Sequence, residues 1–186
     1  MVSERLRKVV NLDKLGRYIP ISPNLLTLLS GLVAWGGVPL VLLLDLPPWL
    51  FILVSGLLDG LDGAVARSRG VVSRRGAFLD SFLDRYSDAA YLVYFWRYVD
   101  PLVIYVALIG TFAISYVRCR GEALGVEVRG VGFMERGERV VYLFLTSLLG
   151  VVFSHFVGAL LYLYAVLVNA AALYRGFVVF RRLSFK

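Results

Sequence analysis

The chain has 186 residues, of which 59% are hydrophobic, and it carries a formal net charge of +7. A soluble domain of this length needs a polar exterior, so the apolar fraction excludes an ordinary soluble protein and indicates one membrane domain over residues 1–186. The positive charge would also suit nucleic-acid binding. Because most of the chain would lie in lipid, we instead expect this charge to set the topology and to attract anionic headgroups, with no nucleic-acid partner.

The first segment, residues 1–20, is basic and lacks the apolar run that a signal peptide needs. Its apolar residues recur every three to five positions, with Lys and Arg residues between them. This spacing predicts an N-terminal amphipathic helix that lies at the membrane surface, next to the first spanning helix. A solvated tail is the alternative that the sequence leaves open.

Long uncharged stretches and proline-marked turns divide the rest of the chain into six helices of membrane-spanning length. Pro47-Pro48 and Asp100-Pro101 mark two of the turns, because proline disfavours helical geometry in the residue before it. A cluster of glycines between 121 and 132 marks a longer loop. We therefore expect an all-α integral membrane protein with six transmembrane helices. The predicted helices cover residues 22–44, 48–68, 76–97, 101–122, 137–154 and 157–181.

The basic residues indicate how these helices are oriented. With six spans, all Lys and Arg residues except Arg85 and Arg97 fall on one side of the membrane. Positive residues favour the cytoplasmic side of membrane proteins. The expected location is thus the cell membrane, with both termini and the active site facing the cytoplasm.

The second and third predicted helices contain aspartates at positions where lipid-facing helices avoid charge. Asp59 and Asp62 are three residues apart, and Asp80 and Asp84 are four apart, so each pair shares one helix face. If the two helices are antiparallel neighbours, the four carboxylates meet and repel one another unless cations neutralise them. Oxygen ligands favour Mg²⁺ or Mn²⁺, whereas zinc is disfavoured because the only His and the only Cys lie elsewhere.

The same stretch contains a spaced motif, Asp59-x2-Asp62-Gly63-x2-Ala66-Arg67-x8-Gly76-x3-Asp80-x3-Asp84. At every fixed position and across both long gaps, it resembles the signature of the CDP-alcohol phosphotransferase (CDP-alcohol phosphatidyltransferase) family. The resemblance implies a metal-dependent enzyme that transfers a lipid-phosphate group from a CDP-lipid to an alcohol and releases CMP. It also implies a homodimer.

The resemblance further implies roles for individual residues. Asp59, Asp62, Asp80 and Asp84 would hold two divalent ions, Mg²⁺ or Mn²⁺. Asp84 would also be the catalytic base that accepts the proton of the attacking hydroxyl. The residues implied to contact the CDP-lipid are Gly63, Arg67 and Ser73, together with Asn24 and Thr27 in a similar segment at the start of the first spanning helix.

Two further segments, 115–123 and 134–139, resemble parts of phosphatidylinositol phosphate and archaetidylinositol phosphate synthases. The resemblance implies inositol phosphate as the acceptor, held by a basic pocket, and CDP-archaeol or CDP-diacylglycerol as the donor. Arg118 stands where those enzymes usually have Lys, which keeps the charge but alters its geometry, and Gly121 stands where they usually have Ala. The alternative is that these arginines are cytoplasmic flank charges. The residues implied to line the pocket are Ser115, Arg118, Arg120, Arg136, Arg139 and Arg175.

Other functions stay open at this point. The same chemistry could use glycerol phosphate or serine as the acceptor, or join CDP-inositol to inositol phosphate. A cation transporter would also use carboxylates within the membrane, although it gives no reason for Gly63, Arg67 and Gly76 at these spacings. A purely structural membrane protein gives no reason for the aspartates.

Overall fold

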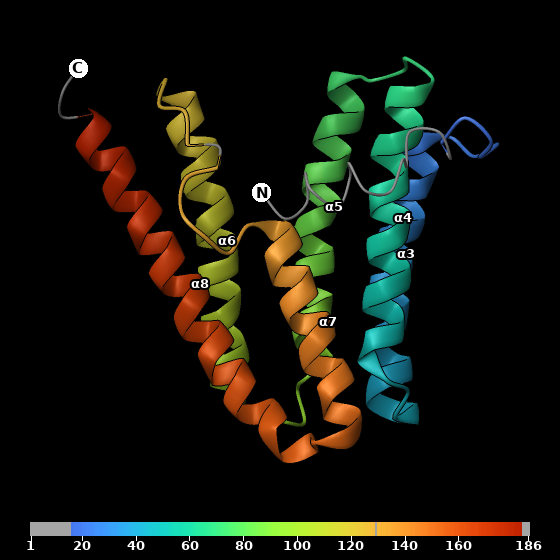
Figure 1. Ribbon diagram of the computed structural model, residues 1–186, viewed down its shortest axis with the longest axis vertical. Helices are drawn as coiled ribbons and strands as arrows, with labels where there is room; N and C mark the ends of the chain where they lie inside the picture. The colour runs from blue at the N-terminus through green and yellow to red at the C-terminus, as the bar shows by residue number, and fades with distance from the viewer. Residues whose placement is uncertain (1–15, 129, 184–186) are drawn as a thin grey trace. The chain divides into compact units, whose positions relative to one another are not determined.

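The computed structural model describes residues 16–128 and 130–183, so residues 1–15 of the predicted amphipathic segment lie outside the described part. The described residues form six long α-helices and no β-strand (Figure 1). In chain order these are α3 (Pro23–Leu44), α4 (Pro48–Ser68), α5 (Arg74–Val93), α6 (Pro101–Ala123), α7 (Arg136–Val152) and α8 (Ser154–Leu183).

Proline and capping side chains explain where these helices begin. Proline opens α3, α4 and α6, where its missing N–H costs nothing and its fixed φ suits the first turn. The side chains of Ser22, Ser73 and Asp100 accept hydrogen bonds from backbone N–H groups in the first turns of α3, α5 and α6. The predicted bounds of α4 agree with the structure. By contrast, α5 ends four residues before the predicted position 97, and α8 begins three residues before 157.

Among the described helices, α3, α4, α6 and α8 are long and apolar enough to cross a membrane. Large apolar side chains such as Leu43, Leu102 and Leu173 are exposed on their outer faces, where lipid would cover them. Helix α5 contains several aspartates and arginines, and α7 has only 17 residues. Four membrane-length helices are thus established by length and composition, and the count of six spans stays a prediction.

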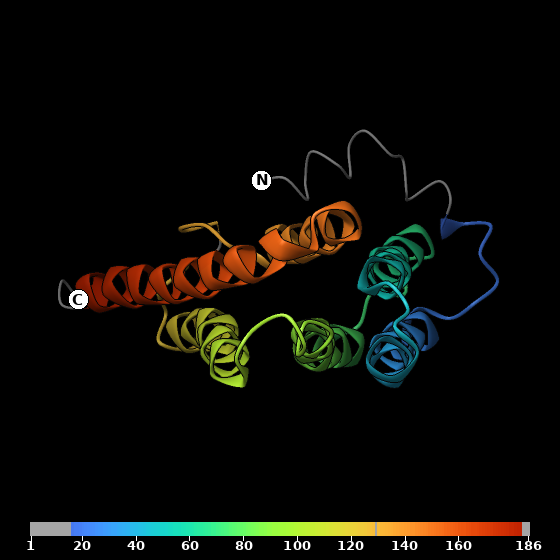
Figure 2. The same ribbon diagram turned by 90° about the horizontal axis from the view of Figure 1, so that it is seen from below.

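The chain divides into two compact units between Tyr94 and Phe95. In the first unit α3 packs along both α4 and α5, whereas α4 and α5 touch each other over a much smaller part of their lengths (Figure 2). In the second unit α8 packs along α6 and also along α7. Helix α3 is therefore the element on which the relative position of α4 and α5 depends.

Close approach of α3 to its neighbours requires a small residue at position 37. A Cβ atom on Gly37 would lie 2.6 Å from Cγ of Phe51 and 2.6 Å from the hydroxyl oxygen of Tyr94. Real Cβ atoms do not approach other heavy atoms this closely, and both neighbours are packed aromatic rings 6.1 Å apart between centroids. Gly37 is thus required by space alone.

We expect Gly37→Ala to lower the free energy of unfolding by about 1–3 kcal/mol, the usual cost of overpacking a core. Thermal unfolding of the purified protein in detergent measures this loss as a lower Tm. Gly36→Ala is the matched control, because a Cβ atom at Gly36 meets nothing within 4 Å. Equal Tm values for the two variants would contradict this packing.

Candidate active site

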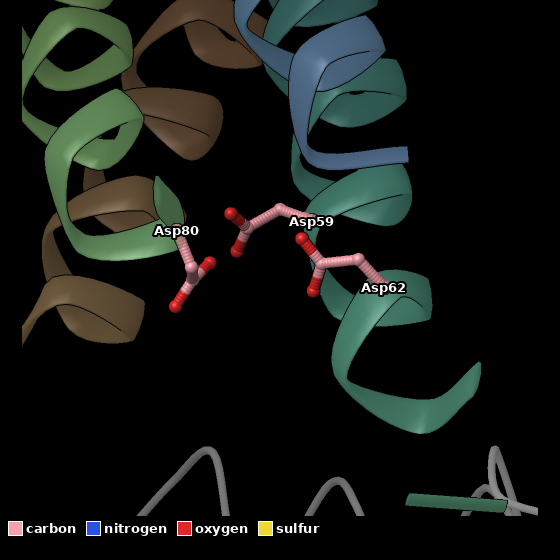
Figure 3. Close-up of side chains that lie close together, drawn as sticks. All are labelled: Asp59, Asp62 and Asp80. Atoms are coloured by element: carbon pink, nitrogen blue, oxygen red, sulfur yellow. The ribbon is translucent and has the colours of Figure 1, made fainter. Parts of the chain in front are cut away.

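Three carboxylates from two helices converge in the first unit. Asp59 and Asp62 project from α4, and Asp80 projects from the first half of α5 (Figure 3). One carboxylate oxygen from each residue lies within 4.8 Å of the corresponding oxygens of the other two. Asp62 is buried, whereas Asp59 and Asp80 are half-buried. The three side chains therefore form one acidic group, which we call the carboxylate triad.

Thr27 fixes the orientation of one member of the triad. Its Oγ1 donates a hydrogen bond to Oδ2 of Asp62 over 2.6 Å, and both side chains are buried. Oγ1 also lies 3.1 Å from the carbonyl oxygen of Pro23, but a hydroxyl has one proton and the charged acceptor makes the stronger bond. Thr27 was predicted to contact the CDP-lipid, and the structure adds a contact with Asp62 that the sequence did not indicate.

Asp84 lies outside the carboxylate triad. It follows Asp80 by one turn of α5, a displacement of about 6 Å along the helix axis. Its side chain is buried, and Oδ2 lies 3.3 Å from Nη2 of Arg85. The sequence led us to expect four carboxylates close together, and the structure brings three of them into one group.

The residues predicted to contact the CDP-lipid lie at two places in the first unit. At the beginnings of α3 and α5, a Cβ atom on Gly76 would lie 3.2 Å from both Oδ1 of Asn24 and Oγ of Ser73. Polar atoms of Asn24 and Ser73 therefore both approach Gly76 closely, and a larger residue at this position would crowd them. On α4, a Cβ atom on Gly63 would lie 3.0 Å from Nη1 of Arg67, so the guanidinium of Arg67 covers this glycine.

In the second unit, two of the predicted arginines are buried and hold the loop between α6 and α7. Nη1 of Arg139 donates to the carbonyl oxygen of Met134 over 2.9 Å. Arg175 donates from Nε to the carbonyl oxygen of Val131 over 2.8 Å and from Nη2 to that of Phe133 over 3.3 Å. These loop contacts use only part of the five N–H groups that each guanidinium carries.

The other predicted acceptor residues are more accessible. Arg118 is exposed and donates from Nε to Oε1 of Glu122 over 3.1 Å, and Arg120 is also exposed. Ser115 and Arg136 are half-buried. Arg175 lies within electrostatic range of Glu135 and Glu138 as well as of Arg118 and Arg139. At least three of the predicted arginines therefore lie near one another within the second unit.

Two arginines that the sequence did not single out also hold backbone carbonyls. Arg69, after the end of α4, donates to the carbonyl oxygens of Ile19 and Ile21. Arg182, near the end of α8, donates to the carbonyl oxygen of Glu127 over 2.6 Å. In the sequence, both arginines count only among the positive charges that indicate the membrane orientation. No local sequence pattern distinguishes an arginine that donates to a distant carbonyl from one that lies in solvent.

The carboxylate triad fits a hard divalent cation. Three carboxylates this close repel one another strongly when all are ionised, and surroundings of low polarity strengthen the repulsion. A divalent cation removes that repulsion, and its preferred ligands are oxygens of this kind. The Thr27 hydroxyl donates to one oxygen of Asp62, and the three carboxylates lie close enough together to share an ion. The residues therefore suit Mg²⁺ or Mn²⁺.

Known proteins of similar sequence and structure agree on one family. The family described as CDP-alcohol phosphatidyltransferase matches residues 20–180. An archaetidylinositol phosphate synthase of Aeropyrum pernix is 46% identical over 121 residues, which cover 64% of this chain and only 62% of that protein. An archaetidylinositol phosphate synthase of Pyrococcus horikoshii is 37% identical over 147 residues, which cover 76% of this chain and 78% of that protein.

A solved structure supports the same assignment. The phosphatidylinositol phosphate synthase of Mycobacterium tuberculosis with CDP-DAG bound is 25% identical, with a TM-score of 0.76 over 90% of this chain and 92% of that chain. The same protein in complex with manganese and citrate has a TM-score of 0.73 and 26% identity, over 91% of this chain and 88% of that chain.

We expect Thr27→Val to weaken binding of Mn²⁺ by about 10- to 100-fold, the usual effect of removing a partner of a metal ligand. Valine keeps the shape of threonine but cannot donate to Asp62, so that carboxylate loses its fixed orientation. Titration of the detergent-solubilised protein with Mn²⁺, followed by electron paramagnetic resonance, measures the change.

Thr146→Val serves as the control for this substitution, because Thr146 is a buried threonine of the second unit. An Mn²⁺ affinity that falls equally in both variants, or in neither, would contradict the role of Thr27.

Proposed function

Because this chain belongs to the CDP-alcohol phosphatidyltransferase family, we propose that it transfers a lipid-phosphate group from a CDP-lipid to inositol phosphate and releases CMP. Family membership makes the chain a multi-pass membrane protein and a transferase of phosphate-containing groups. The observation that carries the proposal is the carboxylate triad, since three aspartates gathered on two helices have little use in a membrane except to hold cations.

The proposed reaction is a substitution at the lipid phosphorus. A hydroxyl oxygen of the acceptor forms a bond to this phosphorus, and the bond from the phosphorus to the bridging oxygen of the diphosphate breaks. CMP leaves with that oxygen, and the hydroxyl proton passes to the carboxylate of Asp84. A buried carboxylate one turn from the triad suits a catalytic base of this kind.

Asp59, Asp62, Asp80 and Asp84 are proposed to hold two divalent ions, Mg²⁺ or Mn²⁺. Such ions would supply positive charge that stabilises the diphosphate and the departing CMP. The manganese in the similar Mycobacterium tuberculosis protein supports this choice of cation. The closeness of Asp59, Asp62 and Asp80 supports these three residues as ligands. Asp84 is included as the fourth because the family motif contains it.

The donor is proposed to lie against the residues around the beginnings of α3 and α5 and along α4. The guanidinium over Gly63 supports contact with a diphosphate there, because arginine forms strong charge-assisted bonds with phosphate oxygens. CDP-archaeol and CDP-diacylglycerol both present this diphosphate. The proposed donor-binding residues are Asn24, Thr27, Gly63, Arg67 and Ser73.

The acceptor phosphate is proposed to bind to the arginines of the second unit. Arg139 and Arg175 support this, because a buried guanidinium already oriented by loop carbonyls loses little freedom when it binds an anion. A neutral acceptor such as serine would offer no phosphate to the buried guanidinium groups of Arg139 and Arg175. The proposed acceptor-binding residues are Ser115, Arg118, Arg120, Arg136, Arg139 and Arg175.

The membrane arrangement is proposed to follow the positions of charge. Helices α5 and α7 would join the four membrane-length helices to give six spans, with the segment 1–20 at the interface and residues 1–186 forming one domain. The family match across residues 20–180, which covers most of each compact unit, supports a single domain. The basic residues support a cytoplasmic active site with both termini on that side of the cell membrane. A homodimer is part of the proposal.

An acceptor assay tests the proposed function. Purified protein receives a CDP-lipid, Mn²⁺ and one labelled alcohol at a time, namely inositol phosphate, inositol, glycerol phosphate or serine. We expect labelled lipid only with inositol phosphate, because the arginines need a phosphate and the pocket must also fit the ring. Product from glycerol phosphate or serine, with none from inositol phosphate, would overturn the acceptor assignment.

Asp84→Asn is the control for this assay and separates the enzyme from a cation transporter. As an enzyme, the variant should lose CMP release by several orders of magnitude, since an amide cannot accept the hydroxyl proton. Ion flux into liposomes by the wild-type protein, without any release of CMP, would instead support transport.

We expect Arg175→Lys to raise the KM for inositol phosphate by about tenfold or more, since a hydrogen bond to a charged group contributes about 1.5–3 kcal/mol. Lysine keeps the charge but cannot hold the carbonyls of Val131 and Phe133 while also binding a phosphate. The KM for the CDP-lipid should stay unchanged.

Arg181→Lys is the matched control on the same helix, because Arg181 is exposed and lies over the ring of Phe177. An unchanged KM for inositol phosphate in Arg175→Lys, or an equal rise in Arg181→Lys, would remove Arg175 from the acceptor site.

A further inference from the structure

Three buried hydroxyl groups join the three helices of the first unit. Ser30 lies on α3, Ser55 on α4 and Tyr91 on α5, and their exposed fractions are 2%, 0% and 0%. Oγ of Ser30 lies 3.0 Å from Oγ of Ser55, which in turn lies 2.6 Å from the hydroxyl oxygen of Tyr91. We call these three residues the hydroxyl cluster.

Each of the three protons in the hydroxyl cluster can be used in one hydrogen bond, which leaves the 3.0 Å contact between the two serine oxygens without a proton. Oγ of Ser30 donates to the carbonyl oxygen of Ser55, and Oγ of Ser55 donates to the carbonyl oxygen of Ser30, each over 2.9 Å. With both serine protons used in this exchange, the proton between Ser55 and Tyr91 comes from the tyrosine. The serines thus hold α3 against α4, and Tyr91 adds α5 to the same point.

The hydroxyl cluster lies on the same helix faces as the carboxylate triad. Ser55 precedes Asp59 by four residues, or about 6 Å along α4. Tyr91 follows Asp80 by eleven residues, which is close to three full turns, so both project from one face of α5. Ser30 follows Thr27, the partner of Asp62, by three residues. The cluster therefore forms a second layer of contacts, about 6 Å from Asp59 along α4 and about 16 Å from Asp80 along α5.

This second layer matters because α4 and α5 have little other contact with each other. The two helices that carry the triad touch over a small part of their lengths, and the bond from Tyr91 to Ser55 joins them directly. A rotation or a slide of α5 relative to α4 would break this bond and would also move Asp80 away from Asp59 and Asp62.

We propose that Ser55 and Tyr91, supported by Ser30, are positioning residues that set Asp80 against Asp59 and Asp62 and thereby determine the affinity of the carboxylate triad for divalent cations. This inference rests on the proposed function of the triad as a metal site. A hydroxyl cluster with only a structural role would change the stability of the protein and leave the metal affinity alone.

The test is Tyr91→Phe, which removes one hydroxyl and keeps the buried ring. Binding of Mn²⁺ is measured by isothermal titration calorimetry, and CMP release is measured over a range of Mn²⁺ concentrations. We expect the dissociation constant and the Mn²⁺ concentration for half-maximal activity to rise by about three- to tenfold, less than for a direct partner of a metal ligand, because Tyr91 acts through the helices. At saturating Mn²⁺, kcat and the KM for the CDP-lipid should return to wild-type values.

Tyr164→Phe is the matched control in the second unit, where the buried hydroxyl of Tyr164 lies 3.2 Å from Oγ1 of Thr111. It should lower the Tm without changing the Mn²⁺ constants. Ser55→Ala provides a second test, and Ser147→Ala is its control, because Oγ of Ser147 is buried and makes no hydrogen bond with the described residues.

Mn²⁺ constants that stay at the wild-type value in Tyr91→Phe and Ser55→Ala, or that shift equally in the controls, would overturn the positioning role. Asp59→Asn separates this result from failure of the proposed function. If the wild-type protein and Asp59→Asn bind Mn²⁺ equally, the triad is not the metal site, and the proposed positioning role is then wrong as well. If only Asp59→Asn loses binding while Tyr91→Phe does not, the metal site stands and the positioning role alone is wrong.

Discussion

Repulsion between carboxylates in surroundings of low polarity is the constraint on which the first unit depends. Asp59, Asp62 and Asp80 bring three carboxylates within 4.8 Å of one another, and two of them lie on α4, which is apolar enough to cross a membrane. Bound cations relieve this repulsion, and the helices must be held firmly enough to resist being pushed apart. The packing of α3 along both α4 and α5 meets this requirement, and the Thr27 hydroxyl turns one carboxylate toward the other two.

The sequence predicted the helix bounds best where a local signal marks an end. Proline at 23, 48 and 101 sets the beginnings of α3, α4 and α6, and these agree with the predicted bounds to within one residue. No such signal marks the end of α5. Apolar residues continue to Trp96, although the backbone leaves the helix after Val93 and forms turns from Tyr94 to Tyr98. The all-helical fold and the family were also predicted from sequence, and both are confirmed.

The site was predictable to the extent that it follows from spacing along a helix. The motif identified the carboxylates of the triad, because residues three or four apart share a face. It did not show which of the four aspartates form the closest group, or that Thr27 donates to Asp62 across 35 positions of sequence. Nor did it show that Arg139 and Arg175 hold loop carbonyls. These contacts join distant segments through single side chains. No periodic pattern of residues along the sequence indicates such contacts.

The bonds from Arg175 to the loop between α6 and α7 have a consequence for the order of assembly. The loop leaves the ribosome before α8, yet the carbonyl groups of Val131 and Phe133 find their partner only on α8. Until that helix has been inserted, these carbonyls depend on water for hydrogen bonds. The loop can therefore reach its final conformation only after the last described helix has been synthesised and has docked within the second unit, so this part of the protein matures late in biosynthesis.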